Sequence, residues 1–186
     1  IDDDRGLLTN LSLQIIGTMK TVCQNKAEVM EVRINDINPN AQVTVHNTFF
    51  LPENAQDFPF DEYDYIVDAV DTVSAKIALV MEANTRNIPI ISSMGAGNKL
   101  DATAFRVADI YETQVCPLAR IMRRELRNRG ITHHTVLFSD EVPISPLPLE
   151  APPPGRRSIP ASLSWVPSCA GLMLGGYVVR DLLGVL

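Results

Sequence analysis

Asp68 and Asp71 are the residues best placed to do chemistry, because they follow an apolar run and precede a long helical pattern. The run has the composition of a buried strand, so both carboxylates are expected at the carboxyl end of that strand. Ligands bind at this edge of α/β sheets, where an acid can face a nucleotide or its magnesium ion. Asp is also a preferred N-cap residue, so the alternative is that Asp71 only caps a helix beginning near Thr72.

Arginines recur at helical spacing in a predicted helix over residues 118–129, and apolar residues occupy its opposite face. They are Arg120, Arg123, Arg124 and Arg127. Such a face suits contacts with RNA phosphates, whereas a solvated helix surface is the alternative.

Cysteine and histidine offer weaker candidates. The cysteines Cys23, Cys116 and Cys169 include no close pair, so they predict neither a disulfide framework nor a Cys-x-x-Cys metal site. For Cys116 and Cys169, a buried structural thiol is favoured over a reactive nucleophile. His133 and His134 lack a second pair of metal ligands at suitable spacing. Unpaired cysteines favour a reducing compartment, and we expect a cytoplasmic protein.

The composition is that of a folded domain. The chain has 186 residues and a formal net charge of −6, which argues against a surface devoted entirely to nucleic acid but permits a local basic patch. The longest apolar tract, residues 165–179, contains Pro167 and is shorter than the roughly 18 residues of a membrane span. We therefore expect a core helix there, with Gly171 and Gly175 allowing tight packing, and no membrane partner.

Strands and helices alternate along the chain and would position these groups. Strands are expected at residues 41–46, 63–71, 89–93, 105–110 and 135–139, and helices at residues 24–37, 72–87, 118–129 and after Pro167. Residues 1–4 have the pattern of a strand end. The segment Gly95-Ala96-Gly97 predicts a turn with positive φ, and the proline-rich residues 143–160 predict a surface loop. Residues 63–93 thus predict a parallel βαβ unit.

Short motifs follow one another in a specific order. They are Asp2-x-Asp4, Thr9-Asn10-Leu11-x-x-Gln14, Thr21-Val22-x-Gln24-x-Lys26, Ile37-Asn38-Pro39, and Asp68-Ala69-Val70-Asp71 followed by Lys76. Their order resembles the adenylating ThiF/MoeB/HesA superfamily, bacterial relatives of ubiquitin-activating enzymes. The later motifs are similar to the branch of tRNA threonylcarbamoyladenosine dehydratases. These are Gly95-Ala96-Gly97, Val107-Ala108-Asp109, Pro117-Leu118-Ala119, Leu137-Phe138-Ser139 and Ser164-Trp165-Val166-Pro167.

The resemblance implies one adenylation domain over residues 1–186 with a Rossmann-like, three-layer α/β fold. Parallel strands would be extended by carboxyl-terminal strands and a packed helix. It also implies a homodimer that activates a carboxylate with ATP and magnesium. In the dehydratase branch, the implied reaction is ring closure of threonylcarbamoyladenosine, with tRNA as the partner.

The resemblance further implies particular site residues. The residues expected to bind ATP are Asp2, Asp4, Asn10, Gln14, Lys26 and Asp71. Asp2 would hold the ribose, Asn10 and Lys26 would lie along the phosphates, and Asp71 would hold magnesium or the phosphate end. Asp71 and Lys26 are the expected catalytic residues, since a cation and a lysine relieve the repulsion between a carboxylate and the α-phosphate.

The sequence also departs from the family pattern. The first βα unit, with the glycine-rich turn that cradles the nucleotide, is expected before Asp2 and is therefore expected to be missing from this chain. Leu13 stands where the family has a phosphate-binding arginine, and Gly6, Gly17 and Cys23 replace more usual residues. Each lost charge-assisted hydrogen bond is worth roughly 1.5–3 kcal/mol, so weak ATP binding is expected.

Two alternatives to the dehydratase hypothesis stay open. An activating enzyme for a ubiquitin-like or sulfur-carrier protein would show an apolar groove for a Gly-Gly tail in place of an arginine face. A non-catalytic dimerisation or scaffold domain would agree with Leu13 and with the missing cradle.

Overall fold

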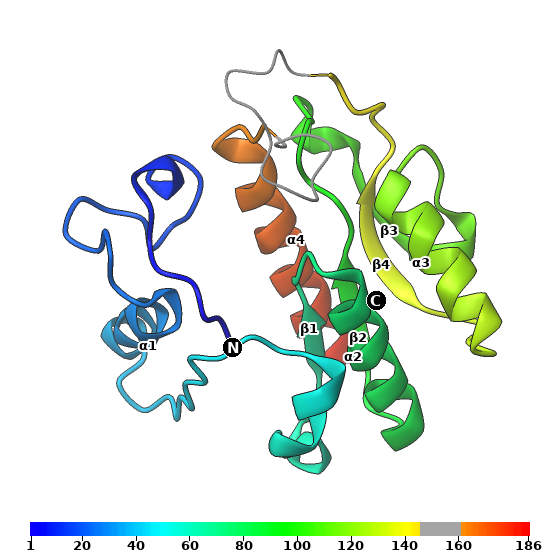
Figure 1. Ribbon diagram of the computed structural model, residues 1–186, viewed down its shortest axis with the longest axis horizontal. Helices are drawn as coiled ribbons and strands as arrows, with labels where there is room; N and C mark the ends of the chain where they lie inside the picture. Colours follow the sequence, from blue (N-terminus) through cyan, green and yellow to red (C-terminus); the bar gives the residue numbers. More distant parts are fainter. Residues whose placement is uncertain (146–160) are drawn as a thin grey trace. The chain divides into compact units, whose positions relative to one another are not determined.

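A computed structural model describes residues 1–145 and 161–186 (Figure 1). The chain divides into two compact units, Ile1–Gln56 and Asp57–Leu186. That both belong to a single adenylation domain stays a prediction. From residue 146 onward, the predicted surface loop of residues 143–160 lies outside the described residues.

The second unit is built on a four-stranded sheet of order β1-β2-β4-β3. The strands are β1 Ile66–Asp68, β2 Ile90–Ser93, β3 Phe105–Asp109 and β4 Thr135–Ser139. β2 is parallel to both β1 and β4, whereas β3 runs antiparallel to β4. The strands predicted between residues 63 and 139 and the parallel βαβ unit are confirmed, although β1 is shorter than the predicted strand at residues 63–71.

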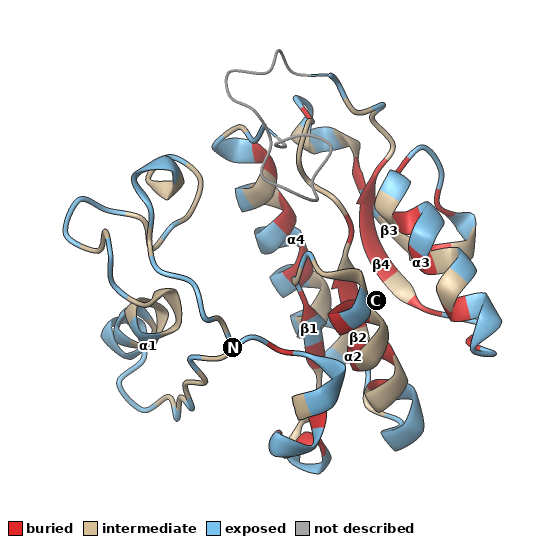
Figure 2. Cartoon of the chain, viewed as in Figure 1, coloured by how far each residue is buried: buried red, intermediate tan, exposed pale blue. Residues whose placement is uncertain are grey.

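Helices cover both faces of this sheet (Figures 1 and 2). They are α2 Val73–Arg86 and α3 Pro117–Asn128 on one face and α4 Trp165–Leu182 on the other. β4 alternates between the two apolar clusters, because Val136 and Phe138 pack with α2 and α3 while Leu137 packs with α4. The predicted three-layer arrangement is confirmed.

Local chemistry sets the ends of the helices. α2 ends at Asn87, whose left-handed φ of 57° Asn tolerates better than most residues. α3 begins with Pro117, which needs no amide hydrogen at that position, and Gly130 follows it with φ 77°. Short 3-10 helices occupy several connections: η1 Leu8–Asn10, η2 Pro52–Asp57, η3 Phe60–Glu62, η4 Ala102–Ala104 and η5 Ile110–Glu112.

The first unit contains one α-helix, α1 Lys26–Ile37, as the sequence predicted within two residues of its start. The predicted strand at residues 41–46 is wrong, and residues 1–4 do not form a strand end. A strand needs a hydrogen-bonded ladder, whereas these two segments are joined by one bond, from the Asp2 amide to the His46 carbonyl at 3.2 Å.

Two further expectations are corrected. The positive φ predicted for Gly95-Ala96-Gly97 falls on Asn98, at 60°. The predicted core helix α4 buries only Val166, Ala170 and Leu174. Side chains added at Gly171 and Gly175 would meet open space, so these glycines do not serve tight packing. Within the described residues, none of the helices has the length and apolarity to cross a membrane.

Candidate functional site

Asp68 and Lys76 form a buried ion pair at the carboxyl end of β1. Lys76 Nζ lies 2.9 Å from Asp68 Oδ2, and both side chains are fully buried. Burial of the ammonium group lowers the pKa of Lys76, against the opposing effect of Asp68. The lysine also donates to the Ser93 carbonyl at 2.7 Å, so the pair joins the ends of β1 and β2 to α2.

Asp71 lies in the loop between β1 and α2 and is exposed, where a carboxylate can reach a ligand. The N-cap of α2 is Thr72 and not Asp71, so the structure does not support the capping alternative. Because carboxylate oxygens are the ligands that magnesium prefers, Asp71 fits the predicted metal-binding role chemically.

The first unit brings together three of its predicted site residues. Lys26 Nζ lies 2.6 Å from Asp4 Oδ2, and its side chain is only 11% exposed, so it is not a freely solvated lysine. Asp2 Oδ1 accepts a hydrogen bond from the Asp4 amide at 2.8 Å. The carboxylates of Asp2, Asp3 and Asp4 lie within 4.8 Å of one another.

Asn10 and Gln14 lie in a compact turn of the same unit. Asn10 Oδ1 accepts from the Leu7 amide at 3.1 Å, and the Gln14 amide donates to the Asn10 carbonyl at 3.0 Å. A Cβ at Gly17 would lie 2.8 Å from that carbonyl, so the glycine that departs from the family pattern is required by this turn. The turn therefore fixes Asn10 through local backbone contacts.

The four arginines predicted to contact RNA lie in different surroundings. Arg123 is partly buried and donates through Nη1 to the Thr113 carbonyl at 2.5 Å, so it braces the chain before α3. The Arg127 guanidinium lies 5.2 Å from the centre of the Tyr111 ring. Arg124 pairs with Glu125 at 2.9 Å but remains exposed, as does Arg120. Arg127 is exposed as well, but its guanidinium contacts the Tyr111 ring, so Arg120 and Arg124 are the pair chosen to test a phosphate contact.

The two histidines differ in environment. His134 is buried, and its Nε2 lies 2.8 Å from Ser92 Oγ. Burial, together with the nearby positive charge of Lys76, lowers the pKa of His134 to about 4, so the ring is neutral near pH 7. His133 is exposed and pairs with Asp109. All three cysteines are free thiols; Cys116 is buried as expected, whereas Cys169 is only partly buried.

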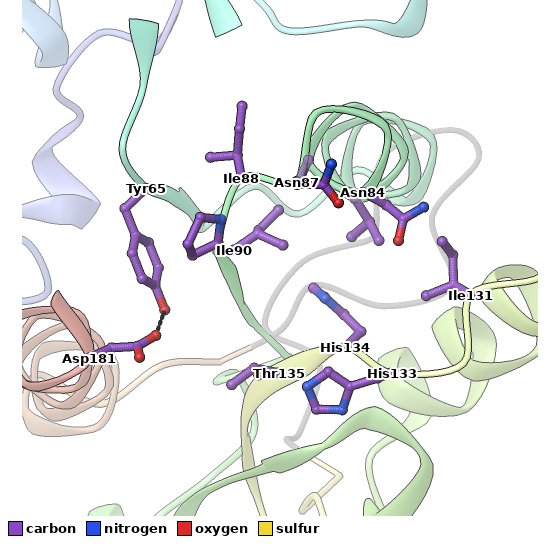
Figure 3. A pocket seen from close by; sticks show the side chains of 13 residues that line it. Tyr65, Asn84, Asn87, Ile88, Ile90, Ile131, His133, His134, Thr135 and Asp181 are labelled. Atoms are coloured by element: carbon purple, nitrogen blue, oxygen red, sulfur yellow. Dashed lines mark hydrogen bonds between the residues drawn. The ribbon is translucent and has the colours of Figure 1, made fainter. Parts of the chain in front are cut away.

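A cavity of about 390 Å³ lies at the amino ends of the parallel strands, whereas Asp71 follows the carboxyl end of β1. Its lining includes Ile90 and Thr135, the first residues of β2 and β4 (Figure 3). At its side, the Tyr65 hydroxyl donates to Asp181 at 2.9 Å. Because the carboxyl ends of the parallel strands lie at the other edge, this cavity is separate from the Asp71 loop.

The ThiF family profile matches residues 1–185. The chain belongs to the ThiF family. A tRNA threonylcarbamoyladenosine dehydratase of Bacillus subtilis is 41% identical to this ThiF protein over 98% of the chain and 76% of the relative. The enzyme of the same name from Escherichia coli is 38% identical, over 69% of this chain and 48% of the relative.

Solved structures agree with the sequence relatives. The E. coli tRNA N6-threonylcarbamoyladenosine dehydratase in complex with AMP superposes with a TM-score of 0.86 at 29% identity, over 98% of this chain and 74% of that one. A complex of the same enzyme with ATP gives a TM-score of 0.85. The predicted superfamily and the mixed α/β fold are therefore confirmed, whereas the predicted lack of the first βα unit stays a prediction.

From the sequence, Asp68 was expected with Asp71 where a ligand binds, and Lys76 was a motif residue without a role, whereas the structure buries both in an ion pair. A signal was present, because a charged residue inside an apolar strand or helix face must find a partner. Asp68 interrupts an apolar strand, and Lys76 lies between Ala75 and Ile77 on a helix that packs on that strand. Two buried charges of opposite sign eight residues apart predict an ion pair.

Proposed function

We propose that this ThiF protein is an ATP-dependent tRNA threonylcarbamoyladenosine dehydratase. The observation that carries the proposal is the 41% identity to such an enzyme across nearly the whole chain. The chain covers about three quarters of that relative, so the activity is assigned as that of the protein to which these residues belong. The exposed Asp71 carboxylate at the carboxyl edge of the sheet agrees with it.

The reaction has two steps. An oxygen of the threonyl carboxylate attacks the α-phosphorus of ATP, the bond to the β-phosphate breaks, and pyrophosphate leaves. An internal nitrogen or oxygen of the modified adenosine then attacks the acyl carbon of this adenylate. The bond to AMP breaks, the ring closes, and the attacking group loses its proton. In total, ATP is cleaved and the nucleoside loses the elements of water.

The site residues divide these tasks in the proposal. Asp2 binds the ribose hydroxyls, and Asn10 and Lys26 contact the phosphates. Lys26 already faces Asp4 and is held by it, so its ammonium group is oriented before a nucleotide arrives. Asp71 holds magnesium, which when bound neutralises charge on the phosphates. Repulsion between the attacking carboxylate and ATP is thereby reduced.

Arg120 and Arg124 contact tRNA phosphates in this proposal, because they are exposed on one face of α3. Replacing both with Glu is expected to lower tRNA affinity and to reduce the steepness of its salt dependence by close to one logarithmic unit per lost contact. Lys20→Glu with Arg33→Glu changes the net charge equally at exposed positions of the first unit and is the control. Equal salt slopes in the two double variants would contradict the arginine contact.

The activity itself is tested with tRNA carrying threonylcarbamoyladenosine. The protein is expected to convert this nucleoside to its cyclic form only with ATP and magnesium, releasing one AMP and one pyrophosphate for each ring. Asp71→Asn is expected to lower the rate by orders of magnitude while leaving the fold intact, since Asp71 is exposed. Adenylation of a carrier-protein tail without ring closure on tRNA would favour the alternative activating function. Calorimetry with ATP and magnesium separately tests the weak binding expected from Leu13.

We further propose that the protein is a cytoplasmic homodimer. The apolar side chains Val32 and Ile37 of α1 are 60% and 73% exposed, and a second copy would cover them. Sedimentation is expected to give a dimer at micromolar concentration. A monomer at the highest soluble concentration would contradict this assembly.

A further inference from the structure

The Asp68–Lys76 pair is unusual among the ion pairs of the described residues, since both of its side chains are fully buried. Removing two charges from water costs several kcal/mol for each ion, and apolar replacements are often equally or more stable. Net stability is therefore a poor explanation for the pair. A better explanation for the pair is the backbone conformation that its hydrogen bonds hold in place.

The side chains of the pair join the start of the loop between β1 and α2 to the first turn of α2. At the start, Asp68 Oδ1 accepts from the Val70 amide at 3.1 Å, while Oδ2 accepts from Lys76. At the end of the loop, the backbone amide of Lys76 donates to the Thr72 carbonyl at 3.0 Å, so the residue that carries the ammonium group is itself part of the first turn of α2. Lys76 Nζ also donates to the Ser93 carbonyl, which ties the arrangement to the neighbouring strand. Asp71 lies between these attachment points.

We propose that Asp68 and Lys76 are positioning residues that fix the backbone of residues 69–72 and thereby hold the Asp71 carboxylate in its working position. The proposal deepens the adenylation function and rests on it for the role of Asp71. Lys76 acts through Asp71 and not on the substrate, because its ammonium group is fully buried and bonded to Asp68 and Ser93.

The pair favours one loop conformation for an electrostatic reason. In a buried environment, an ammonium group that loses its carboxylate partner pays a desolvation cost without compensation. Any loop movement that separates Asp68 from Lys76 therefore carries that cost. A neutral pair of similar size would fill the space but would impose no such penalty on other loop conformations.

Hydrogen exchange measures the loop directly and needs no catalytic activity. In Lys76→Met, the amides of residues 70–72 are expected to exchange at least about tenfold faster than in the unmodified protein at a temperature where both are folded. Lys99→Met is the matched control, because Lys99 is also buried but bonds the Glu141 carbonyl instead. Unchanged exchange at residues 70–72 in Lys76→Met, or equal acceleration in Lys99→Met, would overturn the proposal.

A second variant keeps the test informative if Lys76→Met does not fold. Asp68→Leu with Lys76→Met removes both charges and should restore stability. Its melting temperature is expected to approach that of the unmodified protein while residues 70–72 still exchange faster. Restored stability with slow exchange would show that the pair only fills space.

Kinetics separate a positioning role from a structural one. With Asp71 misplaced, kcat is expected to fall by up to about 100-fold while the KM for tRNA stays constant. In an Asp71→Asn background, Lys76→Met is expected to cause no further loss, whereas Lys99→Met should give a loss that multiplies with that of Asp71→Asn. Multiplying losses for Lys76→Met would overturn the proposal. Absence of turnover in the unmodified protein would instead refute the dehydratase function and leave hydrogen exchange to decide the positioning role.

Discussion

Each unit of the molecule contains an aspartate–lysine pair, and the two pairs differ in how they are held. In the first unit Lys26 faces Asp4, whose side chain is 67% exposed, whereas in the second unit Asp68 and Lys76 are both fully buried. The same difference extends to the surroundings, since only Phe50 and Ala55 are buried among residues 1–56 (Figure 2).

This difference shows two ways of holding functional side chains. The second unit places its groups with an apolar core on each face of a sheet. The first unit relies on turns and on side-chain bonds to nearby backbone, such as that from the Leu7 amide to Asn10. The turn and side-chain bonds of the first unit can open without disrupting a core. The residues of the first unit that are predicted to bind the nucleotide are therefore expected to be more mobile than the groups of the second unit.

The largest expected difference between the units lies in local opening. Amides of α1, which has no buried residue, are expected to exchange at least about 100-fold faster than those of α2, which has five. Native-state hydrogen exchange of the whole chain measures both helices in one sample. Similar protection of α1 and α2 would mean that α1 is covered by a binding partner in solution. If that partner is a second copy of the chain, the protection of α1 would decrease when the protein is diluted.

Core substitutions test the same comparison through stability. Leu126→Ala removes a fully buried side chain of α3 and is expected to reduce the free energy of unfolding by about 2–5 kcal/mol. Val32→Ala, at an α1 position that is 60% exposed, is expected to change it by less than about 0.5 kcal/mol. Urea unfolding of both variants gives these values. A comparable loss for Val32→Ala would break the contrast between the units.

The contrast also explains which features could be predicted from the sequence. β4 was predicted with its observed bounds, Thr135–Ser139, because a strand buried on both faces has a distinctive apolar composition. Residues 41–46 have a strand pattern as well but lack a ladder, and sequence pattern alone does not supply the partner. Predictions were thus more accurate where burial determines the structure.

The residues of the candidate site were also more predictable where burial determines their position. The exposed position of Asp71 after a strand was predictable from its place in the sequence. The burial of that strand was not, because β1 is an edge strand and its Val67 is 49% exposed. The bond from Arg123 to the Thr113 carbonyl was not, because helical spacing gives the face of a side chain but not its hydrogen-bond partner. The Asp68–Lys76 pair lies between these cases, since burial of both charges was predictable but the loop that they hold was not.

A fall in pH below about 6.5 is expected to destabilise the second unit through His134. Its pKa is about 4 in the folded protein and 6.5 in the unfolded chain, so the unfolded chain takes up the proton first as the pH falls. The stability present above pH 6.5 is therefore lost between pH 6.5 and 4, by about 2 kcal/mol at pH 5. The groups facing the ring are Lys76, Asp109 and His133.

His134→Gln isolates this contribution, since it keeps a polar group near Ser92 without a titrating ring. Urea unfolding at pH 7 and pH 5 is expected to show a smaller loss in this variant than in the unmodified protein. His133→Gln, at an exposed position, serves as the control and should retain the full loss. If His134→Gln lost as much stability between pH 7 and pH 5 as the unmodified protein, other groups would be the cause of the acid sensitivity.

A small effect on stability is expected at the Lys26–Asp4 pair of the first unit, in which the Asp4 side chain is 67% exposed. Lys26→Ala is expected to lower the free energy of unfolding by less than about 1 kcal/mol, because Asp4 remains hydrated when its partner is removed. ATP affinity should nevertheless fall by about tenfold or more, as one charge-assisted hydrogen bond to a phosphate is lost. Calorimetry and urea unfolding separate the two quantities, with Lys20→Ala as the control at an exposed position of the same unit. If Lys26→Ala instead destabilised the chain as strongly as Lys76→Met, the Lys26–Asp4 pair would be structural, and the contrast between a unit held by burial and a unit held by turns would fail.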